Sequence, residues 1–584
     1  MLDVDAMLKD YFPSSNTHSD KPLMKAASSL LKKLLHQDEI NRFIETHRYL
    51  EGLEFNDAVL EHFNFSFQVS SKDRGRIPDQ RRVLIVANHP LGSLDGLALL
   101  KLVSEIRTDV KIVATGLLNC IDPLESLFLS VDNFSQSAKH RDSMNQIVKA
   151  LEAEQAVIMF PTGEVSRISP LGVRDGKWKT GFLWLAKKTK APIVPVHIGG
   201  KNSALFYGLS SIYKPLGTVM LVNEMFNKKG SEILFRIGKP IPWESIAAMD
   251  LPKKAVIKLM RKQVYLLGKK KKKELFKPIE NIIHPVRTKL IRKELKASQL
   301  IGKTQDGKHV YLFDYQPNSS VMREIGRLRE LSFRQVQEGT GNALDIDTYD
   351  RYYRHLILWD EDELEIIGSY RIGEAANILA AQGENGLYTH SLFDFSPAFR
   401  PYLEQSIELG RSFIQPRYQG KHSLDYLWYG IGAYLHQHPE IRYLVGPVSM
   451  STMLPESAQK LIAGFYTQLF GMDKPFAIPK LPFAFEPTAE FSSYRHVDEM
   501  EYKRAFSVLK EKLDALGVKV PVLYKQYVEL CKPGGCEFLG FNIDPKFSNC
   551  VDALILVHID AIKEKKYQRY IDSHTAAMHN LHSA

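Results

Sequence analysis

Between residues 82 and 240, short apolar runs alternate with longer stretches in which apolar residues recur with a helical period. The runs have the length of strands buried on both faces, and the periodic stretches have the length of helices. We therefore expect helices over 94–106, 138–153 and 178–189. We expect strands in the segments RVLIVAN, VKIVAT, AVIMF, PIVPVHI and ILFRIGKPI. This alternation predicts an α/β domain with a mostly parallel sheet.

A different pattern starts near residue 300. The segments LILWDED and LEIIGSYRIG predict two antiparallel strands joined at an acidic turn. Further strands are expected in HVYLFDYQP, QSIELGRSFIQP and RYLVGPVSM, and a loop and a helix should follow the second of these. We therefore expect residues 300–584 to form a separate α+β domain.

The region before residue 82 is predicted to be helical over 22–50. Its apolar residues gather near one face, with lysines elsewhere: Leu23, Ala26, Leu30, Leu31 and Leu34. Such a helix either packs on its own domain or lies on a bilayer.

Consecutive lysines, Lys269–Lys273, interrupt the chain between the two patterns. This run is either a solvated linker or a surface that binds anions. We therefore expect a helical N-terminal segment over 1–70, a first domain over 71–265, a lysine-rich linker over 266–299 and a second domain over 300–584.

Composition restricts the class of protein. The 584 residues are 44% hydrophobic and 25% charged, and they carry a net charge of +10 and four cysteines. So few cysteines exclude a disulfide scaffold, and Cys531 and Cys536 lack a second pair at zinc-ligand spacing, so we expect reduced thiols and no metal. We see neither a secretory signal at the start nor an apolar run of about 18 residues. We expect a cytoplasmic protein, soluble or peripheral on a membrane surface, and no nucleic-acid partner.

The segment LIVANHPLGSLDG, residues 84–96, carries the first candidate chemistry. A buried strand ends there in a turn, which holds His89 and Asp95 on one short loop. An imidazole suits general-base catalysis because its ordinary pKa of about 6.5 lies near the pH of the cell, and a carboxylate can orient it. A structural histidine would give the same local pattern.

Two later segments follow this loop in order. They are Phe160-Pro161-Thr162-Gly163 with Glu164 and Arg167, and Val194-Pro195-Val196. Together with Asn88-His89 and Asp95, they resemble the ordered blocks of the glycerophosphate and lysophospholipid acyltransferases over residues 70–245. The resemblance implies acyl transfer from a thioester to a hydroxyl, with His89 as base and Asp95 as its partner. It also implies that the other motif residues bind the acceptor: Asn88, Gly92, Phe160, Pro161, Gly163, Glu164 and Arg167.

The chain departs from that family in two places. His89 and Asp95 are separated by one residue more than usual, which Gly92 can absorb in a bulged turn. The acidic and basic residues after Phe160 are also displaced. This spacing suggests an acceptor whose anionic head differs from a phosphate, such as a carboxylate, which an arginine can bind equally well. Arg167 could instead be a surface ion-pair partner.

The segment 407–435 resembles the core of GNAT-type N-acyltransferases, in which a strand leads through a loop into a helix. The resemblance implies that Arg417, Gly420 and Lys421 bind the phosphate arm of an acyl donor at the helix N-terminus. His422 stands where the family has a small residue. This departure favours an acyl carrier protein over coenzyme A, and no cofactor is expected besides that donor substrate.

Further segments between 300 and 570 resemble the ornithine N-acyltransferases and relatives once labelled haemolysins. They include GRLRELSFRQVQEGTG, IIGSYRIG and YLVGPVSMS. The resemblance implies attachment of a 3-hydroxyacyl chain to the α-amine of an amino acid. We expect Glu408 to be the base, with His355 as the alternative, and Arg371 to bind substrate. The carboxylates of Asp345, Asp347 and Asp350 either bind the substrate ammonium or cap turns.

Both halves resemble the parts of a bifunctional ornithine lipid synthase. This resemblance implies a peripheral location on the inner face of the bacterial cytoplasmic membrane. The second half would N-acylate the amino acid, and the first half would then acylate the new 3-hydroxyl. Three alternatives remain open: a lysophosphatidate acyltransferase fused to an unrelated N-acyltransferase, a membrane-binding or lytic protein without catalysis, and an acceptor other than ornithine, such as glycine, serine, lysine or glutamine.

Overall fold

The computed structural model describes residues 29–574, except 30–31, 34, 115–120, 131–137, 170–171, 213, 270–272, 421, 473–474, 489–490, 492–493 and 495–497. The chain divides into two compact units, which we call the N-terminal unit (Met1–His284) and the C-terminal unit (Pro285–Ala584). The predicted apolar face at Leu23, Ala26, Leu30, Leu31 and Leu34 lies outside the described residues.

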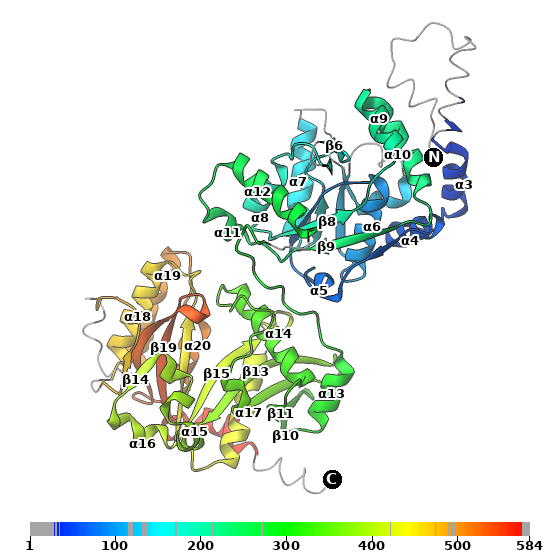
Figure 1. Cartoon of the computed structure of the whole chain (residues 1–584). Helices are drawn as coiled ribbons and strands as arrows, with labels where there is room; N and C mark the ends of the chain where they lie inside the picture. The colour runs from blue at the N-terminus through cyan, green and yellow to red at the C-terminus, as the bar shows by residue number, and fades with distance from the viewer. Residues whose placement is uncertain are drawn as a thin grey trace. The chain divides into compact units, whose positions relative to one another are not determined.

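The N-terminal unit is built on a seven-stranded sheet in the order β1-β9-β8-β2-β5-β3-β4 (Figure 1). Every described pairing in it is parallel except β8 with β9, which confirms the predicted α/β class. The strands are β1 (Ser66–Gln68), β2 (Val83–Ala87), β3 (Val110–Ala114), β4 (Phe128–Ser130), β5 (Ala156–Met159), β8 (Ile193–Gly199) and β9 (Glu232–Ile237).

Helices cover both faces of this sheet. One core lies between the sheet and α4 (Gly52–His62) and α6 (Ser93–Ser104). The other lies under α7 (Ala138–Glu152), α8 (Gly181–Thr189) and α12 (Lys253–Leu267). The remaining elements are α3 (Gln37–Thr46), α5 (Ser71–Arg74), α9 (Ala204–Ile212), α10 (Lys214–Asn227), α11 (Trp243–Ala247) and the hairpin of β6 (Arg167–Ser169) and β7 (Gly172–Arg174).

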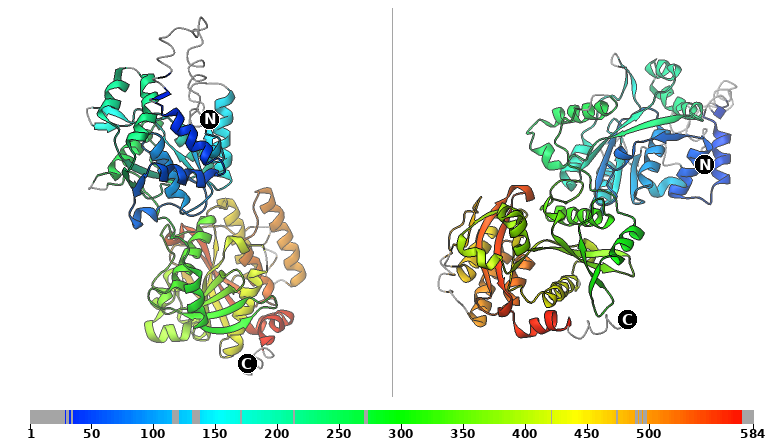
Figure 2. Two further views of the ribbon diagram at one scale, coloured as in Figure 1. Left: turned by 90° about the vertical axis from the view of Figure 1, so that its right-hand side faces the viewer. Right: turned by 60° about the horizontal axis from the view of Figure 1, so that its bottom comes forward.

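The C-terminal unit contains an eight-stranded sheet in the order β10-β11-β12-β13-β15-β16-β19-β18, antiparallel except for β15 with β16 (Figure 2). Its strands are β10 (Gln299–Lys303), β11 (His309–Asp314), β12 (Arg354–Asp360), β13 (Glu365–Glu374), β15 (Ser406–Ile414), β16 (Tyr443–Met450), β18 (Cys536–Asp544) and β19 (Cys550–His558). Its main helices are α13 (Thr288–Lys296), α14 (Ser320–Gln335), α15 (Ala375–Gln382), α17 (Ser423–Gln437), α18 (Glu456–Phe470), α19 (Glu499–Ala515) and α20 (Val522–Leu530).

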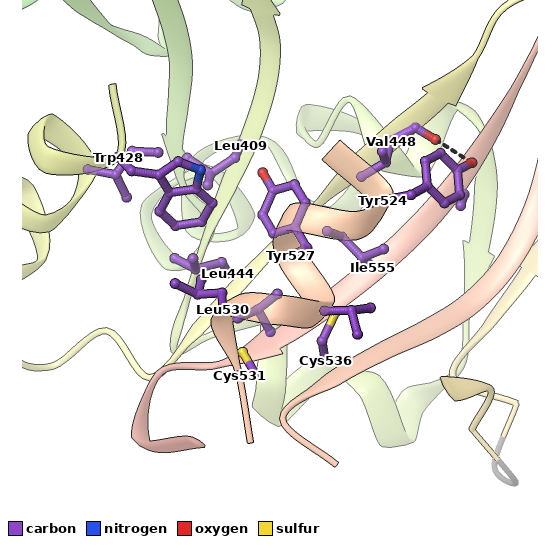
Figure 3. Packing of buried hydrophobic residues seen from close by; sticks show 14 of the residues in the cluster. Leu409, Trp428, Leu444, Val448, Tyr524, Tyr527, Leu530, Cys531, Cys536 and Ile555 are labelled. Carbon is purple, nitrogen blue, oxygen red and sulfur yellow. Dashed lines mark hydrogen bonds between the residues drawn. The ribbon is translucent and has the colours of Figure 1, made fainter. Parts of the chain in front are cut away.

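One face of the C-terminal sheet carries a continuous apolar core (Figure 3). Tyr524 and Tyr527 of helix α20 pack against the strands in this core. The Tyr524 hydroxyl donates a hydrogen bond to the Val448 carbonyl (3.0 Å). Leu409 of β15 points into this core. Since successive strand residues point to opposite faces, Glu408 lies on the other face.

The structure differs from two predicted boundaries. The segment 1–70 is not helical throughout, because Ser66–Gln68 pair with β9 and extend the sheet. The segment 266–299 is not a separate linker. The Ile279 amide donates to the Pro240 carbonyl (2.9 Å) within the N-terminal unit. In the C-terminal unit, the Glu294 side chain of α13 accepts the Ser320 amide at the start of α14 (2.9 Å). These hydrogen bonds fix each part of the segment to one unit.

Candidate active sites

The loop after β2 brings His89 and Asp95 together. β2 is buried throughout, and Gly92, whose φ of 103° favours glycine, turns the chain into α6. Asp95 lies in the first turn of α6, where its Oδ2 accepts the Leu91 amide (2.9 Å). Its Oδ1 is 3.1 Å from Nδ1 of His89, in an ion pair that is not aligned as a straight hydrogen bond. The longer spacing therefore still produces the pair.

His89 is held in a setting that suits a general base. Its ring stacks on Phe160, with 4.1 Å between the ring centroids, and 19% of its side chain is exposed. Burial by itself would lower the pKa of His89, but the charges of Asp95 and Asp175 outweigh it, so the pKa lies above its ordinary value. With Nδ1 facing Asp95, Nε2 is the nitrogen positioned to take a proton from a substrate hydroxyl.

Several residues predicted to bind the acceptor also make contacts that hold this loop in place. The Asn88 amide group donates to the Ile198 carbonyl (2.9 Å) and accepts the Ile198 amide (2.7 Å), so it fastens the loop to β8. Phe160 supports the His89 ring, and the Pro161 carbonyl accepts the Lys179 amide (2.9 Å). Gly163 closes a turn by donating to the Phe160 carbonyl (3.1 Å). These contacts hold the loop in place, and acceptor binding by these residues stays a prediction.

Glu164 and Arg167, the two charged residues predicted to bind the acceptor, have different surroundings. Glu164 is exposed. Arg167 lies 5.7 Å from the centroid of the Phe206 ring and donates weakly to the Ser210 carbonyl of α9 (3.5 Å). The structure thus directs Arg167 toward α9, and its binding of an anionic head group stays a prediction.

Sequence reasoning missed Asp175 and Ser166, which lie behind His89. Asp175 Oδ1 accepts the backbone amide of His89 (3.2 Å) and the Ser166 hydroxyl (2.5 Å). The Ser166 amide in turn donates to the His89 carbonyl (2.7 Å). The one local signal for Asp175 was its place in the segment RDGKWKTGF, where a single aspartate lies between a strand and a helix.

In the C-terminal unit, Glu408 is buried on the face of the sheet opposite the apolar core. Its carboxylate accepts the Thr389 amide (3.2 Å) and the Thr389 hydroxyl (3.1 Å), and 2% of the residue is exposed. Burial raises the pKa of Glu408 to about 7, against the opposing charge of Arg371. A carboxyl group with that pKa can exchange a proton with an amine near neutral pH.

Glu408 stands where two parallel strands stop pairing. Residues Ser406–Glu408 of β15 pair with Tyr443–Val445 of β16, and the described parallel pairing ends there. Immediately beyond, β15 carries a bulge in which Arg411 has a φ of 49°. Glu408 therefore lies at the end of the described parallel pairing, next to the bulge of β15.

Arg371 lies among carboxylates and tyrosine rings. Its Nη1 is 2.7 Å from Asp347 and 3.4 Å from Asp350, and 1% of the residue is exposed. Its guanidinium also lies within 6 Å of three ring centroids, those of Tyr349, Tyr353 and Tyr388. In the described state Arg371 is therefore a structural cation, and direct substrate binding by it stays a prediction.

The three candidate aspartates are all paired with arginines. Asp350 meets Arg329 at 2.8 Å, and Asp345 and Asp347 each lie 3.3 Å from Arg411. Asp347 also caps a turn by accepting the Tyr349 amide (2.9 Å). Turn capping is thus confirmed for Asp347. Arg411, which sequence reasoning missed, pairs with two of these aspartates, Asp345 and Asp347.

His355, the alternative base, is ruled out by its surroundings. Burial, with the neighbouring charge of Arg329, lowers its pKa to about 3. Its Nδ1 accepts from Arg329 (3.3 Å), and its Nε2 donates to the Asp350 carbonyl (3.3 Å). A ring with such a low pKa that is already bonded at both nitrogens is too weak a base to accept a substrate proton.

The predicted donor-binding loop connects β15 to α17. Arg417 is exposed and pairs with Glu363 and with Glu365 (2.9 Å), so its guanidinium is held at the surface by two carboxylates rather than facing the helix N-terminus. Gly420 has a φ of 76°, and a side chain there would meet no described atom within 4 Å. Lys421 lies outside the described residues. The loop backbone thus fits the predicted role better than the Arg417 side chain does.

Both halves of the chain match families of acyltransferases. Residues 11–273 match a model of the family described as acyltransferase, and residues 328–429 match that of the acetyltransferase (GNAT) domain. These matches confirm the two resemblances seen in the sequence, and they identify the chain as an acyltransferase.

Characterised relatives fall into two kinds. A glycine N(alpha)-acyltransferase of Bacteroides thetaiotaomicron is 32% identical over 317 residues, which are 51% of this chain and 93% of that protein. A lyso-glycine lipid O-acyltransferase of the same organism is 32% identical over 259 residues, 43% of this chain and 92% of that protein. An L-ornithine N(alpha)-acyltransferase of Rhodobacter capsulatus is 27% identical over 269 residues, 43% of this chain and 92% of that protein.

Proposed function

Because this chain belongs to the acyltransferase family through its first half and to the GNAT family through its second, we propose that it makes a diacylated aminolipid in two steps. One observation carries the proposal: the chain is similar to an N-acyltransferase and to a lyso-lipid O-acyltransferase that are separate proteins in one bacterium. The C-terminal unit acts first and the N-terminal unit second.

In the first step, the α-amine of an amino acid attacks an acyl thioester beside Glu408. The amine loses a proton to the Glu408 carboxylate, the amide bond forms and the thiol leaves. The position of Glu408 supports this placement, since it lies on β15, the strand that leads into the predicted donor-binding loop. We assign acyl carrier protein as the donor, because His422 stands beside Gly420 where coenzyme A would need close backbone approach.

In the second step, the hydroxyl of the new 3-hydroxyacyl chain loses its proton to Nε2 of His89 as it attacks a second thioester. Asp95 holds the ring through Nδ1 and stabilises the imidazolium that forms. The first step supplies the hydroxyl, and its product carries a carboxylate head in place of a phosphate.

Glycine is the acceptor that we favour, with ornithine as the second candidate. The glycine N-acyltransferase relative is 32% identical to this chain, against 27% for the ornithine enzyme. The structure adds a chemical reason. Ornithine brings a second ammonium group, whereas Asp345, Asp347 and Asp350 are already paired with arginines. A buried ammonium without its own carboxylate would be costly.

The acceptor can be tested with the purified full chain, 3-hydroxyacyl carrier protein and single amino acids. We expect glycine to be acylated faster than ornithine by about tenfold or more, as judged by kcat/KM from mass spectrometry. Lysophosphatidate serves as the control acceptor for the O-acylating unit and should not be converted. Preferential conversion of lysophosphatidate over the monoacyl amino acid would establish a phospholipid-making enzyme instead.

We also propose that the protein binds an anionic membrane surface through Lys269–Lys273. No helix in the described part of the chain has the length and apolar character to cross a bilayer. Of the lysines, 270–272 lie outside the described residues. Clustered lysines are attracted to anionic lipid by about 1 kcal/mol each, and salt screens that attraction.

Vesicle flotation tests this surface. The protein should float with phosphatidylglycerol vesicles at low salt and not with phosphatidylcholine vesicles. A variant with all five lysines, Lys269–Lys273, replaced by glutamate should stay in the soluble fraction. If that variant still floats but shows a raised KM for acyl carrier protein, the lysines bind the acidic carrier rather than the membrane.

A further inference from the structure

Asp175 lies directly behind His89, in the loop between β7 and α8. It is 2% exposed, and its carboxylate accepts three hydrogen bonds. Two reach Oδ1, from the His89 amide (3.2 Å) and the Ser166 hydroxyl (2.5 Å). The third reaches Oδ2, from the indole Nε1 of Trp178 (2.8 Å). The Asp175 carboxylate therefore links the His89 loop to Ser166 and Trp178, which come much later in the chain.

Asp175 and Ser166 together fix both backbone polar groups of His89. Asp175 accepts the His89 amide, and the Ser166 amide donates to the His89 carbonyl (2.7 Å). Because the Ser166 hydroxyl also binds Asp175, the three residues form a closed ring of hydrogen bonds. A ring of this kind sets the height and tilt of the imidazole relative to Asp95.

The long helix α12 holds Asp175 itself in place. The Asp175 amide donates to the Tyr265 hydroxyl (2.7 Å), and its carbonyl accepts a hydrogen bond from Arg261. The Arg261 guanidinium is thus bound to the Asp175 carbonyl, while the three hydrogen bonds to the Asp175 carboxylate come from uncharged donors. Burying a carboxylate in this way costs stability, and such a cost is typical of residues kept for function.

The charged and titratable groups around the imidazole come from three elements. Asp95 projects from α6, Asp175 from the loop before α8, and Tyr265 from α12 behind Asp175. Phe160 covers the ring face and carries no charge. Two carboxylates therefore flank one imidazole, and both favour its protonated form.

We propose that Asp175 is a positioning residue for O-acylation, which orients His89 through its backbone and stabilises the imidazolium formed during transfer. The proposal rests on the function assigned above to His89. No covalent step passes through Asp175: the proton moves from the substrate hydroxyl to Nε2 of His89 and then to the leaving thiolate.

The variant Asp175→Asn tests the proposal in the full chain. With the monoacyl amino acid supplied as acceptor, we expect kcat for O-acylation to fall by about 10- to 100-fold and KM to change little, because small misplacements of a catalytic group have effects of this size. O-acylation needs neutral His89, so its rate rises with pH through the pKa of that ring. Removing a nearby negative charge lowers this pKa, and the acid limb of the pH profile should therefore move to lower pH.

Two further variants separate positioning from folding. In Asp175→Asn, the amide NH2 and the Trp178 indole N–H would be two donors facing each other. Adding Trp178→Phe removes one of these donors, and the double variant should still show the acid limb of the pH profile shifted to lower pH. Ser166→Ala keeps the charge of Asp175, so it should lower the rate of O-acylation without shifting the acid limb of the pH profile. N-acylation by the same molecules reports only that the C-terminal unit is intact, so thermal unfolding followed by circular dichroism reports the folding of the N-terminal unit in each variant. Asp73→Asn, which removes a buried carboxylate paired with Arg76 in the N-terminal unit, is the matched control.

The outcomes distinguish this inference from the function on which it depends. A wild-type chain that does not O-acylate the monoacyl amino acid contradicts the proposed function. The positioning role is overturned if the wild-type chain O-acylates the monoacyl amino acid and Asp175→Asn keeps the full rate. It is also overturned if Asp175→Asn loses rate but the acid limb of its pH profile does not move. If neither Asp175 variant yields folded protein, Asp175 serves stability alone and the inference is wrong.

Discussion

Replacing His89 by alanine should stop the second acylation and leave the first intact. General-base catalysis contributes about 10²- to 10⁴-fold to such reactions, so the O-acylation rate should fall by that factor. N-acylation takes place in a unit with its own sheet and core, so its rate should not change. Cells that express the variant should accumulate the monoacyl amino acid, which mass spectrometry of their lipids detects.

A second histidine in the same sheet provides the control. His197 of β8 is mostly buried, and burial lowers its pKa to about 4, so it is neutral at the pH of the cell and lies against Gly268 rather than beside a carboxylate. His197→Gln should keep normal O-acylation. If His89→Ala still makes the diacyl lipid at the wild-type rate, another group is the base and the assignment of this site fails.

Replacing Glu408 by glutamine should remove both lipid products from cells. The variant keeps the shape of the side chain and can still bind Thr389, but it cannot take a proton from the amine, so N-acylation should fall by about 10²- to 10⁴-fold. Without the first product the second unit has no acceptor. When the monoacyl amino acid is supplied to the purified variant, O-acylation should proceed at the wild-type rate.

The pH profile of the wild type gives a second measurement. Glu408 must be ionised to act as a base, and burial raises its pKa to about 7. N-acylation should therefore rise with pH through about 7 and lose its activity below that value, and the inflection should vanish from the residual rate of Glu408→Gln. Asp360→Asn removes another buried carboxylate, one paired with Lys308 (2.9 Å), and should keep the profile. An unchanged rate in Glu408→Gln would mean that water or another residue takes the proton.

The parts of the fold that the sequence predicted share one physical property. Strands buried on both faces, such as β2 and β5, are unbroken apolar runs bounded by turns, so their positions can be identified to within a residue or two. β1 could not be found in this way, because it has three residues and pairs with β9, which lies far along the chain. The hairpin of β18 and β19 was also not predicted as strands, although it completes the second sheet.

The candidate-site residues that could be predicted were likewise those with a local signal in the sequence. His89 and Asp95 are close in sequence, so one loop brings them together. Glu408 was proposed because its strand leads into the predicted donor-binding loop. Asp175 is distant from His89 along the chain, and a single aspartate gives no pattern. Arg411 lies in a bulge with a positive φ, which interrupts the alternation from which its orientation would be inferred.

The join between His284 and Pro285 has a consequence for metabolism. In the proposed function one polypeptide contains both catalysts, so translation makes them in equal numbers and gene expression cannot adjust their ratio. A single-chain acyl amino acid is a detergent, and at a given supply of acyl donor its steady-state concentration depends on the relative rates of the two units. Selection on such a fusion would act to make the esterifying half the faster of the two.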